Sequence, residues 1–199
     1  MHMNICVYGA SSAQIPQGYL DAAFGLGAEI ARRGHTLVFG AGDSGVMGQT
    51  ARGAHSEGGR VIGISPSFFH VDGVLYERCD KLILTETMRE RKARLEEMGE
   101  AFIAAPGGVG TFEEFFEVLT LRTLGLLEKP IALLNTNGCY DPLLAMLRRG
   151  AEERFLTDAV LDLIIVSSSA EEILDEIAAF RPVPHAIDYY KEIERKDET

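Results

Sequence analysis

The sequence predicts an α/β fold, a single Rossmann-like, doubly wound parallel sheet with helices on both faces. Short apolar β-type runs alternate with longer amphipathic stretches along the chain, which is the pattern of repeated βα units. Several of the short runs are apolar throughout, as expected of strands that helices cover on both sides. A chain of 199 residues, 46% of them hydrophobic, suits one domain with a sizeable core. We expect residues 1–180 to form that domain and residues 181–199 to form a polar C-terminal tail.

The first expected strand follows the N-terminus almost at once. The opening "MHMNICVYG" has no basic stretch ahead of an apolar core, so a secretory signal is not expected. Each further short apolar run is assigned to one of the following strands. The expected strands lie near Ile5–Tyr8, Thr36–Phe39, Val61–Ser65, Lys81–Thr85, Phe102–Ala105, Ile131–Leu134 and Leu163–Val166.

The amphipathic stretches between these runs are expected to be helices. In the stretch after Ala105, the residues Phe112, Phe115, Phe116 and Leu119 follow helical spacing and are expected to pack in the core. The expected helices lie near Gly18–Arg33, Gly45–Glu57, Met88–Met98, Thr111–Leu126, Pro142–Glu153 and Ala170–Phe180. A long loop remains from Pro66 to Asp80, and its aromatic residues either cover a pocket or pack beneath the loop. Those aromatic residues are Phe68, Phe69 and Tyr76.

Composition excludes several classes of function. The formal net charge of −11 argues against nucleic-acid binding, which needs clustered Lys and Arg. No apolar run is long enough to span a bilayer, so no membrane partner is expected. Three widely spaced cysteines, Cys6, Cys79 and Cys139, fit reduced thiols in a cytoplasmic protein. The histidines are scattered without ligand spacing, so no metal site is expected.

Glycine occurs in three turns that follow expected strands: "YGASS", "FGAGDSGVMG" and "PGGVGT". In open parallel sheets, ligands bind beyond the carboxyl ends of the strands, so these turns are the places to look for chemistry. The second turn contains GxGxxG at Gly40, Gly42 and Gly45, but no acidic residue ends the following strand "VIGISP", which disfavours NAD or FAD. None of the turns contains the Gly-Lys-Ser/Thr of a P-loop. Two readings remain, a pocket for a phosphate or mononucleotide and tight turns that need glycine only for their geometry.

The turn "PGGVGT" opens a helix, and the unpaired N–H groups of a helix N-terminus suit an anion such as phosphate. Glu114 follows in the first turn, on a row that it shares with Val118 and Leu121, so its carboxylate is expected beside the glycine turn on a partly apolar surface. The alternative for Glu114 is a favourable charge at a helix N-terminus. Glu113 and Glu117 lie on another row and are expected to face solvent.

Arg91 is the polar member of an otherwise apolar helical row formed by Leu84, Met88, Leu95 and Met98. A guanidinium on such a row needs an anionic partner, which can be Glu114, a substrate phosphate, or each in turn. The alternative is a structural ion pair or a snorkelling side chain. A phosphate cradle beside a carboxylate and an arginine suits cleavage at the anomeric carbon of a ribose phosphate, where a carboxylate stabilises an oxocarbenium-like transition state.

Three motifs in this sequence resemble the LOG family, the cytokinin riboside 5′-monophosphate phosphoribohydrolases. "PGGVGTFEE" is similar to the family's PGGxGTxxE, "GAGDSGVMG" to GGGxxGLMG and "MRERKA" to MHERKA. The likeness runs from Ile5 to about Ile177, with the motifs in the family's order. The resemblance implies catalytic positions for Arg91 and Glu114. It implies a substrate- and phosphate-binding set at Gly42, Gly45, Met47, Met88, Lys92, Gly107, Gly108, Gly110 and Thr111.

The resemblance further implies a Rossmann-like homodimer that needs no metal or redox cofactor. We expect an enzyme that hydrolyses the N-glycosidic bond of an adenosine 5′-monophosphate, with or without an N6 substituent, to the free base and ribose 5-phosphate. The alternative is a non-catalytic nucleotide or molybdenum-cofactor carrier of the same superfamily. Arg89 and Leu121 depart from the family's histidine and tryptophan, which leaves the preferred base open. The family's older label, lysine decarboxylase, is disfavoured because neither glycine turn carries a Schiff-base lysine.

Overall fold

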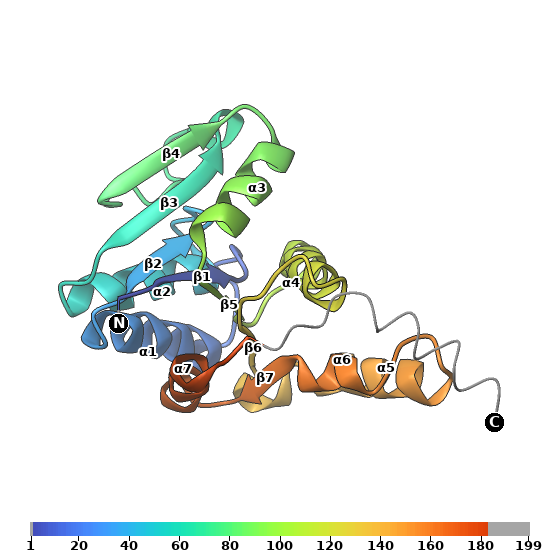
Figure 1. Ribbon diagram of the computed structural model, residues 1–199. Helices are drawn as coiled ribbons and strands as arrows, with labels where there is room; N and C mark the ends of the chain where they lie inside the picture. The colour runs from blue at the N-terminus through green and yellow to red at the C-terminus, as the bar shows by residue number, and fades with distance from the viewer. Residues whose placement is uncertain (1, 183–199) are drawn as a thin grey trace, which may run out of the picture.

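A parallel sheet of seven strands forms the centre of the molecule, in the order β4-β3-β2-β1-β5-β6-β7 (Figure 1). The computed structural model describes residues 2–182, so most of the expected tail at 181–199 lies outside the described residues. The expectation of a doubly wound parallel sheet is confirmed. The strands are β1 (Asn4–Tyr8), β2 (Thr36–Phe39), β3 (Val61–Pro66), β4 (Lys81–Thr85), β5 (Ala101–Ala104), β6 (Ile131–Leu134) and β7 (Ile164–Ser167).

Helices cover both faces of the sheet, because alternate residues of the central strands point into two separate apolar cores. Val7 and Phe39 pack in the core beneath α1, α2 and α7, whereas Cys6 and Val38 pack in the core beneath α3, α4 and α5. The helices are α1 (Gln17–Arg32), α2 (Gly45–Ser56), α3 (Met88–Met98), α4 (Val109–Thr123), α5 (Asp141–Glu152), α6 (Ala159–Asp162) and α7 (Ala170–Ala179). The sequence did not predict α6 or the 3-10 turns η1 (Ser67–Phe69) and η2 (Thr136–Gly138), which are too short for a periodic pattern.

The helix α4 begins and ends earlier than the expected range Thr111–Leu126. It begins inside the glycine turn, and Gly110 occupies a helical position. The sequence did not predict this position because glycine has a low helix propensity. It ends at Thr123 because Gly125 takes the left-handed conformation, with a φ of 69°. The N–H of Leu126 then donates to the carbonyl of Leu121, which is the closing hydrogen bond of a Schellman motif.

The order of the strands determines where a ligand can bind. β1 pairs with β2 on one side and with β5 on the other, so the chain direction across the sheet reverses between β1 and β5. The connections that leave these two strands go to opposite faces and open a crevice at the carboxyl ends. The three glycine-bearing turns follow β1, β2 and β5, and all of them therefore lie at this edge.

Two glycines allow α1 and α2 to cross at very short range. A Cβ at Gly27 would lie 1.9 Å from the carbonyl oxygen of Thr50, and a Cβ at Gly53 would lie 1.9 Å from that of Phe24. Both clashes are with backbone atoms, which cannot rotate away as a side chain can. The two helices must therefore separate if either glycine acquires a side chain.

We expect Gly27→Ala to lower the free energy of unfolding by about 1–3 kcal/mol, the usual cost of overpacking a core. Gly25 on the same helix is the matched control, because a Cβ there meets nothing within 4 Å. Gly25→Ala should raise stability by up to about 1 kcal/mol through helix propensity. Urea denaturation followed by circular dichroism measures both. Equal midpoints for the two variants would show that the close crossing does not constrain the fold.

Candidate active site

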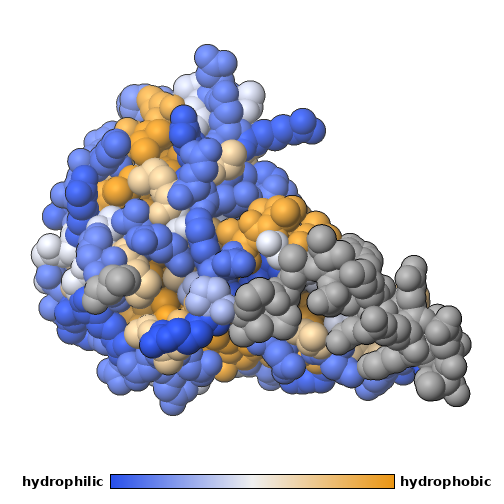
Figure 2. All heavy atoms as spheres, viewed as in Figure 1, coloured by the Kyte–Doolittle hydropathy of each residue, from blue (hydrophilic) through white to orange (hydrophobic). Residues whose placement is uncertain are grey.

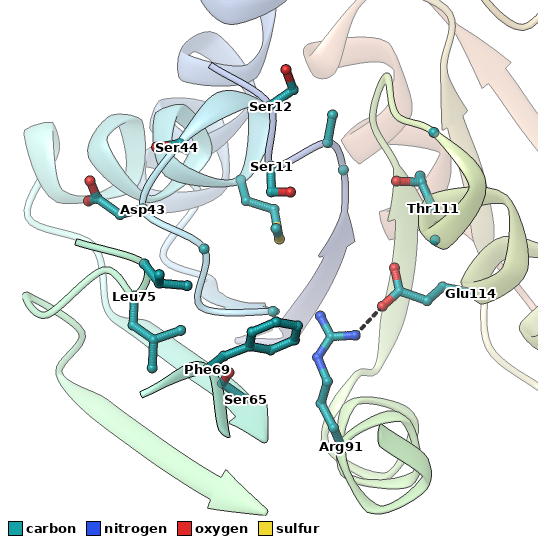
Figure 3. Close-up of a pocket in the computed structure, with 18 of the residues that line it drawn as sticks. Ser11, Ser12, Asp43, Ser44, Ser65, Phe69, Leu75, Arg91, Thr111 and Glu114 are labelled. Atoms are coloured by element: carbon teal, nitrogen blue, oxygen red, sulfur yellow. Dashed lines mark hydrogen bonds and ion pairs between the residues drawn. The ribbon is translucent and has the colours of Figure 1, made fainter. Parts of the chain in front are cut away.

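A cavity of about 720 Å³ lies at the carboxyl ends of the central strands, and all three glycine-bearing turns contribute to it (Figure 3). Gly9, Gly42 and Gly108 represent the turns that follow β1, β2 and β5, respectively. The remaining walls come from α3, from the first turns of α4 and from the connection between β3 and β4. The cavity is therefore the crevice that the strand order predicts.

The position of Arg91 follows from the way α3 begins. The hydroxyl of Thr87 accepts a hydrogen bond from the N–H of Glu90, and the carboxylate of Glu90 accepts one from the N–H of Glu86. These two hydrogen bonds resemble a capping box and fix the start of the helix at Met88. Arg91 then lies one turn into α3, on the face that points to the carboxyl ends of the sheet.

The guanidinium of Arg91 is buried, with 8% of the residue exposed, and is held from several sides. Its Nε donates to the carbonyl oxygen of Ile64 at 3.3 Å, and its Nη1 donates to Glu114 Oε1 at 2.5 Å. On a third side, a Cβ at Gly40 would lie 1.9 Å from Nη2 and would displace the guanidinium from this position. Of the partners considered for Arg91, the structure supplies Glu114 (Figure 3).

Glu114 is equally buried, with 8% of the residue exposed, and its neighbour on the same row, Val118, is in the core. Burial raises the pKa of the Glu114 carboxyl above its ordinary value of 4.5, and the charge and hydrogen bond of Arg91 offset only part of this effect. The carboxylate is therefore more basic than an exposed glutamate. It lies at the edge of the cavity, in the second turn of α4. The expectation of a place in the first turn was wrong, because the helix begins at Val109 and its first turn holds no acidic residue.

The N-terminus of α4 opens onto the same cavity. Gly108 is the N-cap residue, and no side chain caps the helix there. The N–H of Phe112 is the first to donate within the helix, to Gly108 at 3.0 Å, so the N–H groups of Val109, Gly110 and Thr111 have no intrahelical acceptor. Such a terminus favours an anion through its N–H groups and its partial positive charge.

The glycine turn before α4 is held by its neighbours. The hydroxyl of Tyr140 donates to the carbonyl oxygen of Ala105 at 2.7 Å, and the N–H of Ala10 donates to that of Pro106 at 3.1 Å. The side chain of Thr111 closes the inner side of the turn, because a Cβ at Gly107 would lie 2.0 Å from Thr111 Oγ1. Glycine at position 107 is thus required by packing within the turn.

The structure brings most of the candidate residues into the cavity. Those that line it are Arg91, Glu114, Gly42, Met47, Met88, Gly108, Gly110 and Thr111. Gly45 and Gly107 do not line it. Gly45 has a φ of 65° and lies against the carbonyl oxygens of Ala10 and Ser12, so its glycine serves the geometry of the turn. Gly107 lines a smaller neighbouring cavity instead.

Lys92 also lies outside the cavity. It follows Arg91 by one residue, which rotates its side chain about 100° around the helix. There it pairs with Glu113 and Glu117, the latter at 3.0 Å. This pairing is compatible with the expectation that Glu113 and Glu117 face solvent. The expectation that Lys92 belongs to the substrate-binding set is wrong, because its side chain does not line the cavity.

Several lining residues were not among the candidates. Among them are Ser11, Ser12, Asp43, Ser65, Phe69 and Leu75. Ser11 and Ser12 follow the end of β1, which is a signal that the sequence offered, whereas Ser65 lies within β3. Of the loop aromatics, Phe69 lines the cavity, whereas Tyr76 is buried and bonded through its hydroxyl to His55 at 2.8 Å. Arg89 and Leu121, the two departures from the family pattern, do not line this cavity.

Two further properties bear on the class of protein. Among residues 2–182, no group of three or more His, Cys, Asp or Glu side chains is placed to hold a metal ion. Within the same residues, no helix has the length and apolar character that crossing a membrane requires.

Similar proteins agree with the motifs in this site. Residues 47–177 match the family model described as "Possible lysine decarboxylase". The chain is 38% identical over 178 residues to cytokinin riboside 5′-monophosphate phosphoribohydrolase LOG of Oryza sativa subsp. japonica, covering 89% of this chain and 74% of that protein. It is 36% identical to LOG3 of Arabidopsis thaliana, a cytokinin riboside 5′-monophosphate phosphoribohydrolase, covering 89% and 83% of the two chains.

Solved structures share the fold. The molybdenum cofactor carrier protein of Chlamydomonas reinhardtii aligns with a TM-score of 0.69 over 90% of this chain and 98% of that one, at 24% identity. This similarity concerns the fold alone. The match to the family model over most of the chain, together with the plant relatives, shows that this chain belongs to the LOG family of phosphoribohydrolases, within the wider family described as possible lysine decarboxylases.

Proposed function

We propose that this protein is an enzyme that hydrolyses the N-glycosidic bond of an adenosine 5′-monophosphate carrying a cytokinin-type N6 substituent. The observation that carries the proposal is the buried pair of Arg91 and Glu114, set beside a helix N-terminus that no side chain caps. The plant relatives are cytokinin riboside 5′-monophosphate phosphoribohydrolases, which supports the same reaction. A carrier would need the anion-binding turn but not a carboxylate with a raised pKa.

In the proposed reaction, the 5′-phosphate binds the N–H groups at the start of α4, together with Thr111. This places the ribose beside Glu114, whose carboxylate stabilises positive charge at C1′ and orients a water molecule. The bond from C1′ to the base nitrogen breaks, the water oxygen bonds to C1′, and a proton from water passes to the departing base. Arg91 fixes the carboxylate and keeps it available as the ionised form.

Decarboxylation of lysine is a poorer fit to the site. That reaction normally depends on a Schiff-base lysine, which holds pyridoxal phosphate as an electron sink. Among the described residues that line the cavity, none is lysine. Lys92 follows the lining residue Arg91 in the sequence, but its side chain pairs with glutamates outside the cavity and cannot serve as the Schiff-base lysine.

The pH profile provides a prediction for this assignment. The ionised form of Glu114 is the one proposed to act, so activity is present above its pKa and is lost as the pH falls through it. Because burial raises that pKa, the acid limb of kcat/KM should lie at higher pH than the ordinary glutamate value of 4.5. Initial rates of base release over a range of pH measure it. An acid limb at or below 4.5 would contradict the role given to Glu114.

The proposed function itself is tested by product analysis. Purified protein is incubated separately with AMP and with isopentenyladenosine 5′-monophosphate, and free base and ribose 5-phosphate are separated by chromatography. Equimolar release of both products supports the reaction, and the ratio of rates gives the base preference. Nucleotide binding without release of base would contradict it and would favour the carrier.

We also propose that the protein is a homodimer. Large apolar side chains are exposed around α4 and α5, where the space-filling view shows a hydrophobic area in the region of α4 (Figure 2). Leu126, Met146 and Phe155 are examples. Light scattering at several concentrations tests this, and a monomeric mass throughout would contradict it.

A further inference from the structure

The cavity has two chemically different sides. The polar side carries the hydroxyls of Ser11 and Thr111 with the pair of Arg91 and Glu114. The other side is mainly apolar and is formed by Met47, Phe69, Val74, Leu75 and Met88. It also includes the polar residues Asp43, Ser44 and Ser65, which Figure 3 shows on the side of Phe69 and Leu75. Figure 3 shows Phe69 and Leu75 across the cavity from Thr111 and Glu114. A ligand that fits both sides must itself have a charged end and an apolar end.

The apolar side is held in place by the turn after β2. The N–H of Asp43 donates to the carbonyl oxygen of Val74 at 3.0 Å, and the N–H of Tyr76 donates to that of Ala41 at 2.8 Å. Gly42 and Leu75 form an isolated antiparallel bridge between these two hydrogen bonds. The connection between β3 and β4 is therefore attached to the same turn that lines the cavity floor.

Phe69 belongs to this connection and lines the cavity, with its ring directed towards Arg91 (Figure 3). It ends η1, which follows β3 directly, and its carbonyl oxygen accepts a hydrogen bond from the N–H of Val71 at 2.8 Å. Although Phe69 lines the cavity, it is 44% exposed, so its ring has uncovered area that a ligand can bury. The ring of Phe68 packs beside it, with centroids 4.6 Å apart, but Phe68 does not line the cavity.

We propose that Phe69 is a specificity-determining residue that stacks on the nucleobase, and that Val74 and Leu75 beside it receive an apolar substituent of that base. The proposal rests on the proposed function for its orientation. With the phosphate at the start of α4 and C1′ beside Glu114, the base extends to the apolar side. A cavity of about 720 Å³ lies in the upper half of the range of ligand pockets, about 300–1,000 Å³, which leaves room for a substituent.

The test measures binding in a Glu114→Gln background, so that substrate is not consumed. Calorimetry gives the Kd of isopentenyladenosine 5′-monophosphate, AMP and ribose 5-phosphate for that background and for the same background with Phe69→Ala, Phe69→Tyr or Phe68→Ala. Phe68→Ala is the matched control, since it removes an exposed neighbouring ring that does not line the cavity. Ribose 5-phosphate is the probe without a base.

Phe69→Ala should raise the Kd of both nucleotides about 10- to 100-fold, which is the range expected for loss of aromatic stacking on a base. The Kd of the substituted nucleotide should rise more than that of AMP. The Kd of ribose 5-phosphate should stay within about twofold, and Phe69→Tyr should restore nucleotide binding because it restores the ring. Equal effects of Phe69→Ala and Phe68→Ala, or equal weakening of ribose 5-phosphate, would overturn the proposal. These outcomes do not depend on turnover, so failure of the wild-type protein to release base would contradict the proposed function alone.

Discussion

Glu114→Gln should reduce kcat by about 10²- to 10⁴-fold, the range expected when a general base or a charge-stabilising group is removed. Glutamine has nearly the shape of glutamate and keeps an oxygen that can accept the hydrogen bond from Arg91 Nη1. It cannot carry the negative charge that stabilises C1′ in the transition state. The fold and the phosphate-binding turn should therefore survive while the chemistry is lost. Chromatography of released base gives kcat, and thermal unfolding confirms the fold.

Glu113→Gln is the matched control for this variant. Glu113 is the preceding residue on α4, but it is exposed and pairs with Lys92 outside the cavity. Its replacement should leave kcat within about twofold, because exposed ion pairs contribute little. If Glu114→Gln retained wild-type turnover, or if the two variants lost activity equally, Glu114 would have no special role in the reaction.

Arg91→Lys should reduce kcat/KM by about 10²-fold, because loss of positioning by small displacements has effects of this size. The planar guanidinium donates at once to Ile64 and to Glu114, and a lysine ammonium cannot reproduce that fixed fork. The charge and hydrogen bond of Arg91 lower the pKa of Glu114, whereas burial raises it. With a weaker partner the pKa of Glu114 should therefore rise further, and the acid limb should move to higher pH. A rate profile against pH detects both changes.

Arg89→Lys makes the same chemical change two residues earlier on α3. Arg89 is exposed and does not line the cavity, so this variant should keep both the rate and the acid limb of the wild type. If the Arg91 variant lost activity with no movement of the acid limb, Arg91 would act on the substrate rather than through Glu114.

Local sequence signals predicted the regular elements well. The range Met88–Met98 was predicted without error, because the apolar row sets the helical period. The cap formed by Thr87 and Glu90 was found only in the structure. The strands are within about one residue of the expected ranges. The central strands β1, β2, β5 and β6 are apolar runs that helices cover on both faces, whereas the edge strands β4 and β7 are partly exposed. The end of α4 was placed too late, because a leucine-rich pattern continues past Gly125, which breaks the helix by its backbone conformation.

The sequence by itself determined the parallel α/β class, the three glycine-bearing turns and the two charged residues that stand on apolar rows, because periodicity and side-chain chemistry are local properties. Only the tertiary structure decided which of these meet. Arg91 and Glu114 are on different helices and come together because α3 and α4 cover the same face of the sheet. The side chain of Lys92 points away from the cavity because it is one residue further around the helix than Arg91. Gly45 lies against Ala10 and Ser12 and does not line the cavity. Phe69 and Tyr76 have similar rings in one loop, yet one lines the cavity and the other is buried. Such outcomes depend on contacts between segments far apart in the chain, which no local pattern records.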